Sequence, residues 1–83
     1  MSEFEILVRD LLSAIDGDVC TRSRVLDALL DLRLAAGGRT DVIALVDSAL
    51  TDLPGRTMVP AEWWRERLEI ISLTASSGVE TVG

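Results

Sequence analysis

The side chains that most often carry chemistry are scarce in this chain of 83 residues, which holds one cysteine and no histidine. Cys20 stands just before a segment of helical periodicity, where a helix N-terminus would favour its thiolate. A thiol nucleophile needs a base, however, and histidine, the usual base, is absent. One cysteine without histidine also cannot form a zinc site of the common kinds. We therefore interpret Cys20 as a small apolar residue that is buried or half-buried.

Acidic side chains are numerous, and one group of them resembles the start of a calcium-binding loop. In Asp16-Gly17-Asp18 the two aspartates would hold the first and third loop positions, and Asp27 would hold the twelfth. The sixth position requires glycine for its sharp turn but holds Thr21, so we interpret the segment as a linker between helices. The remaining carboxylates are spread along predicted helix faces, and nothing marks a pair of them as an acid–base couple. The sequence therefore predicts no metal site, no cofactor and no enzyme.

Basic side chains are few, and 14 acidic residues against 8 basic ones give a formal net charge of -6. The segment Thr21-Arg22-Ser23-Arg24 is locally basic and could bind an anion at a helix start, but no glycine-rich phosphate loop accompanies it. Two predicted helices joined by Gly37-Gly38-Arg39-Thr40 have the layout of a helix-turn-helix. The second of them offers Asp and Ser where a recognition helix offers Arg, Lys, Asn or Gln. We expect a plain helical hairpin, with neither nucleic acid nor an anionic membrane as a partner.

Two adjacent tryptophans followed by an arginine form the most informative segment. Neighbouring helical residues point about 100° apart, so Trp63 and Trp64 cannot both enter one narrow core stripe. Trp64 shares its spacing with Leu68 and Ile71, which assigns it to the core. Trp63 is left at the edge of the core, against another element or against another chain, and Arg67 can stack over it. Because Trp and Arg are enriched at binding hot spots, alanine at Trp63 is expected to weaken association by more than about 1 kcal/mol.

Apolar residues that recur at three- and four-residue spacing predict the elements that must position these side chains. They define four helices, at about 3–16, 22–36, 41–53 and 60–74, and no sustained alternation of the strand type occurs. The second helix is expected to end at Gly37-Gly38 and the third at the turn signature Pro54-Gly55. The expected fold class is all-α, a compact bundle of four short helices. We expect a single helical domain over 1–75 and a frayed, flexible tail over 76–83.

The helix expected at about 22–36 is apolar on two sides. A helix of this kind is usually buried between neighbours, so we expect it at the centre of the fold. The sequence leaves open whether its second stripe is covered by the helix at 60–74 or by a second chain. The first stripe consists of Val25, Ala28, Leu29, Leu32 and Ala36, and the second, about 130° away, of Leu26, Leu30 and Leu34.

Composition places the chain among acidic, globular proteins. Apolar residues make up 48% of it, within the usual range, and no run of 18 apolar residues predicts a transmembrane helix. The first residues, MSEFEILVRDLL, carry two glutamates rather than a positive segment, so we expect no secretory signal and a cytoplasmic location. Basic residues that are all Arg, with abundant Ala, Gly, Val and Asp, suggest GC-rich coding DNA and a bacterial or phage source.

We expect a non-enzymatic protein–protein interaction module whose partner is the chain itself, as a homodimer or larger homo-oligomer. A domain this short buries only a modest share of its surface, so surplus apolar side chains are available for an interface. One alternative is a small acidic regulator or inhibitor, antitoxin-like or phage-encoded, that binds a basic cleft on a partner. Another is a nucleic-acid-binding domain of the helix-turn-helix type that uses Arg22, Arg24 and Arg39. The predicted interface residues are Trp63, Arg67, Ile70, Leu26, Leu30 and Leu34.

Overall fold

The computed structural model describes the backbone of residues 3–80 and the side chains of residues 3–76. Within this part of the chain the predicted all-α fold of four helices is confirmed, and two three-residue strands lie in the connections between them. The elements are α1 (Glu3–Ala14), β1 (Val19–Thr21), α2 (Arg22–Ala35), α3 (Thr40–Asp52), β2 (Met58–Pro60) and α4 (Ala61–Glu80).

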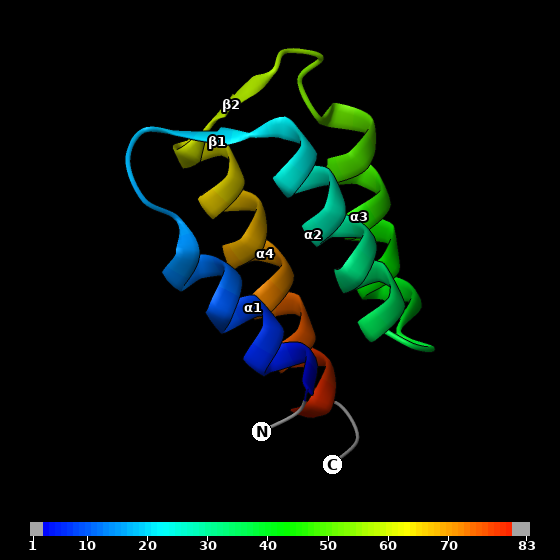
Figure 1. Ribbon diagram of the computed structural model, residues 1–83. Helices are drawn as coiled ribbons and strands as arrows, with labels where there is room; N and C mark the ends of the chain where they lie inside the picture. The colour runs from blue at the N-terminus through cyan, green and yellow to red at the C-terminus, as the bar shows by residue number, and fades with distance from the viewer. Residues whose placement is uncertain (1–2, 81–83) are drawn as a thin grey trace.

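The four helices run alternately up and down and form a ring (Figure 1). The packed neighbours are α1 with α2, α2 with α3, α3 with α4, and α4 with α1. Short connections favour this arrangement, because each helix then packs beside the one that follows it. We expected α2 at the centre of the bundle, and this expectation is wrong. The helix α2 packs against α1 and α3 and lies diagonally across the ring from α4, which leaves its outer side uncovered.

The core is built from the apolar stripes that the sequence predicts. Trp64 is 4% exposed and lies with Leu68 and Ile71 on the inner face of α4, as their spacing indicates. Val59 of β2 is fully buried and contributes a core side chain that the helical pattern did not reveal. The largest fully buried side chains are Leu29, Leu32, Leu68, Ile71, Val25, Val42, Val46 and Val59.

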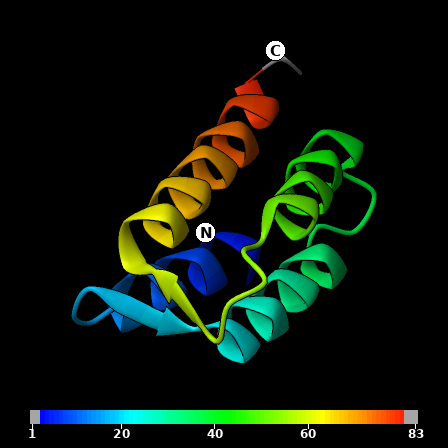
Figure 2. The same ribbon diagram turned by 90° about the horizontal axis from the view of Figure 1, so that it is seen from above.

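The two strands pair because both of their connections lie at the same end of the bundle. The α1–α2 and α3–α4 connections come together there, and β1 and β2 form an antiparallel ladder that Figure 2 views from above. Cys20 is opposite Val59, and Val19 is opposite Pro60. The N–H of Ala61 donates to the carbonyl of Asp18 at 2.8 Å, which joins the start of α4 to β1. Strands of three residues are too short to show the alternation from which a strand is predicted.

The opposite end of the bundle is held together by Arg39. Gly37, with φ +60°, ends α2 in the left-handed conformation that glycine adopts readily. The Arg39 guanidinium then donates to both carboxylate oxygens of Asp41, at 3.1 and 2.9 Å, and to the carbonyls of Thr74 and Ala75, each at 3.2 Å. The hydrogen bonds between Arg39 and Asp41 lower the pKa of Asp41 and raise the pKa of Arg39.

The helix α4 continues to Glu80, beyond the end that we predicted near residue 74. Ala75 is buried, and the bonds from Arg39 hold the backbone at Thr74 and Ala75, so tertiary packing supports this turn. Residues 76–80 of the predicted tail are therefore helical in backbone. The last part of that tail, 81–83, lies outside the described residues.

Candidate functional site

The second apolar stripe of α2 is largely open to solvent. We call Leu26, Leu30 and Leu34 the outer stripe of α2. Leu26 is half-buried against the core, whereas Leu30 is 46% exposed and Leu34 is 81% exposed. The exposure rises along the helix because successive residues four positions apart rotate by about 40°. Within the described chain, α4 does not cover this stripe, so the first of the two coverings that the sequence left open is excluded.

The predicted interface residues of α4 lie elsewhere, beside α3. The guanidinium carbon of Arg67 is 5.3 Å from the centre of the Trp63 ring, so the predicted stacking is confirmed. The same guanidinium has a nitrogen 4.0 Å from the carboxylate of Asp52 on α3. Ile70 is 38% exposed and borders a small hollow between the two helices together with Leu45 of α3.

The structure therefore does not gather the six predicted interface residues on one continuous apolar face. The outer stripe of α2 lies on one side of α3, since Arg33 of α2 pairs with Asp47 of α3 at 2.9 Å. Trp63, Arg67 and Ile70 lie on the other side of α3, along its contact with α4. Sequence reasoning placed the two groups on their own helices but could not order the helices around the ring.

Two of the three arginines invoked for nucleic-acid binding form hydrogen bonds within the chain. The Nε–H of Arg22 donates to the carbonyl of Pro54 at 2.9 Å, which joins the start of α2 to the connection after α3. The guanidinium of Arg39 donates hydrogen bonds to Asp41 and to backbone carbonyls of α4. Arg24 is exposed on the first turn of α2. These contacts give Arg22 and Arg39 a role in holding the fold together.

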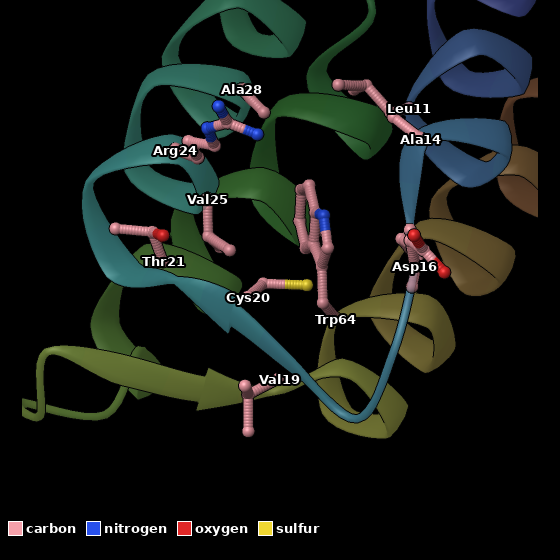
Figure 3. A pocket seen from close by; sticks show the side chains of 11 residues that line it. Leu11, Ala14, Asp16, Val19, Cys20, Thr21, Arg24, Val25, Ala28 and Trp64 are labelled. Carbon is pink, nitrogen blue, oxygen red and sulfur yellow. The ribbon is translucent and has the colours of Figure 1, made fainter.

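A cavity of about 240 Å³ between α1 and α2, close to β1, was not predicted from the sequence. Small side chains leave this space, because Ala14 of α1 and Ala28 of α2 both border it. Figure 3 shows the Trp64 ring standing between Leu11 and Ala14 on one side and Arg24 on the other. The signal that could have revealed the cavity is the pair of alanines, which stand where larger residues would close the contact.

The polar side chains of this cavity include the donors Trp64 and Arg24, the acceptor Asp16, and Cys20 and Thr21, which can do both. The indole of Trp64 makes no hydrogen bond to any described residue, yet its nitrogen is not sealed from solvent. Figure 3 shows this nitrogen on the α1 side of the ring, and the thiol of Cys20 directed toward the same indole. Arg24 borders the cavity on the α2 side, and Asp16 borders it beyond the end of α1. Cys20 is half-buried, as we expected.

Among the described residues, no three His, Cys, Asp or Glu side chains come close enough together to hold a metal ion. Over the same part of the chain, none of the helices has the length and apolar character needed to span a lipid bilayer. No protein-family model, curated protein or solved structure matches this chain.

Proposed function

We propose that this protein is a non-enzymatic protein–protein interaction module that self-associates through the outer stripe of α2. The observation that carries the proposal is the exposure of Leu34, at 81%, beside Leu30, at 46%, on the same side of one helix. An amphipathic helix binds by laying such a face against a complementary apolar surface. A second copy supplies that surface, because a two-fold interface uses the same residues on both chains.

The size of the stripe sets the strength of the association. Full burial of a leucine side chain is worth about 1.5–3 kcal/mol, so two leucines on each of two chains contribute at most about 6–12 kcal/mol. Association itself costs about 4–15 kcal/mol in lost freedom of motion. The expected dimer is therefore weak and depends on protein concentration.

Charge distinguishes this proposal from the alternative of an acidic regulator. Two copies that each carry a formal net charge of -6 repel one another, and salt screens this repulsion. Self-association should therefore be unchanged or strengthened when salt is added. Binding to a basic cleft on another protein should weaken steeply under the same conditions.

Sedimentation equilibrium of matched variants tests the proposal. Leu34→Gln should weaken self-association by more than about 1 kcal/mol, or at least fivefold in Kd, because it removes an apolar contact twice from the dimer. Leu73→Gln is the control, since Leu73 is 68% exposed but lies on α4. Equal effects of the two variants would refute the assignment to α2.

A third variant tests the other group of predicted interface residues. Trp63→Ala removes the ring over which Arg67 stacks at the contact of α3 with α4. If Trp63→Ala dissociates the protein while Leu34→Gln does not, the interface lies beside α3 and α4 instead. The helical circular dichroism of each variant shows whether the fold is retained.

A further inference from the structure

We infer that the cavity between α1 and α2 is a binding site for a small apolar carboxylate, such as a molecule with a single six-membered ring. This inference is independent of the proposed self-association, because the cavity borders β1 and the inner side of α2. The class of ligand follows from the walls of the cavity, from the hydrogen-bonding groups that face it, and from its size.

The hydrogen-bonding groups select an acceptor. Trp64 is 4% exposed, and its indole N–H lacks a partner among the described residues. This N–H is reachable from solvent and competes with no protein acceptor, so an acceptor on a ligand can bond to it without breaking a contact within the chain. Arg24 adds a second, charged donor on the other side of the ring (Figure 3). A carboxylate can accept from either kind of donor, and its hydrogen bond with a guanidinium, here that of Arg24, is among the stronger ones in proteins.

The walls select an apolar body for the ligand. Leu11, Ala14, Val25 and Ala28 border the cavity with aliphatic groups. Its volume of about 240 Å³ exceeds that of a cavity of about 150 Å³ known to hold benzene. A single ring or a short aliphatic chain therefore fits with its carboxylate toward Arg24. Asp16 also borders the cavity and opposes an anion, so it weakens binding without changing the class of ligand.

Titration with benzoate, followed by two-dimensional ¹H–¹⁵N NMR, tests the inference. The indole N–H resonance of Trp64 should shift saturably, while that of Trp63 should remain in place. The two resonances are assigned with Trp63→Phe. Toluene, which has the ring but no acceptor, should bind at least about tenfold more weakly, since a hydrogen bond to a charged group contributes about 1.5–3 kcal/mol.

Variants complete the test. Arg24→Gln should weaken benzoate binding at least about tenfold, whereas Arg65→Gln, the same change on the exposed side of α4, should not. Asp16→Asn should tighten binding, and Ala14→Leu should abolish it by filling the cavity. The inference is overturned if benzoate leaves the Trp64 resonance unmoved, if toluene binds equally well, or if Arg24→Gln binds like the wild type.

Discussion

Two leucines of α2, only two positions apart, should differ greatly in how much the same substitution changes the free energy of unfolding. Leu32 is fully buried in the core, whereas Leu34 is 81% exposed. Leu32→Ala removes buried methyl groups and leaves a cavity, so it should lower the free energy of unfolding by about 2–5 kcal/mol. Leu34→Ala should change it by less than about 0.5 kcal/mol when the protein is dilute. Both substitutions replace leucine by alanine in the same helix, so the difference between the two losses measures the effect of burial.

Urea titration followed by circular dichroism measures both variants. A chain of this length is stable by about 4–12 kcal/mol, and each 1 kcal/mol shifts the melting temperature by about 4–8 °C. If Leu32→Ala fails to fold, Ile71→Val provides a milder core change, with an expected loss of about 0.5–1.5 kcal/mol. A loss above about 2 kcal/mol for Leu34→Ala in dilute solution would show that this side chain is buried within one chain. The reasoning about the outer stripe of α2 would then be refuted.

Three further changes test local features of the fold by urea titration. Gly17→Ala should lower the free energy of unfolding by about 1–2 kcal/mol because Gly17 has φ +81°, a left-handed conformation that alanine adopts only with strain. Gly38→Ala, at a position without positive φ, should not show that loss. Arg22→Gln should lower the free energy of unfolding by about 1 kcal/mol, because it removes the hydrogen bond to the carbonyl of Pro54. No change would mean that this hydrogen bond does not stabilise the fold. Arg39 lowers the pKa of Asp41 below 3.8, mainly by hydrogen bonding. The contribution of the Asp41 carboxylate to the free energy of unfolding is therefore present above that pH and is lost as the pH falls through the lowered pKa. Asp41→Asn should be less stable than wild type at neutral pH and equal to it in strong acid, and a gap that persists in strong acid would contradict this.

The helices and their inner faces could be predicted from the sequence because burial in a helical bundle follows the helical period. The positions of Trp64, Leu68 and Ile71 illustrate this, as does the stacking of Arg67 on Trp63. Spacing along one helix fixes which side chains share a face. It also fixes which of two adjacent tryptophans enters the core.

The order of the helices around the ring could not be predicted, because periodicity contains no information about which helix faces which. The second apolar stripe of α2 therefore led us to expect a central helix, although Leu34 at the end of this stripe is exposed to solvent. The pairing of Cys20 with Val59 depends on two connections that meet only in the folded chain. The cavity beside Trp64 also arises from tertiary packing, where Ala14 and Ala28 border one space.

The most direct test of the central claim is the solution mass of the wild-type protein, measured by light scattering on a sizing column over a range of concentrations. Self-association through the outer stripe of α2 predicts a mass that rises from the chain mass of 9.0 kDa toward twice that value as concentration increases. Added salt should leave this rise unchanged or enhance it. A mass that stays at 9.0 kDa at every concentration and salt level would contradict the account.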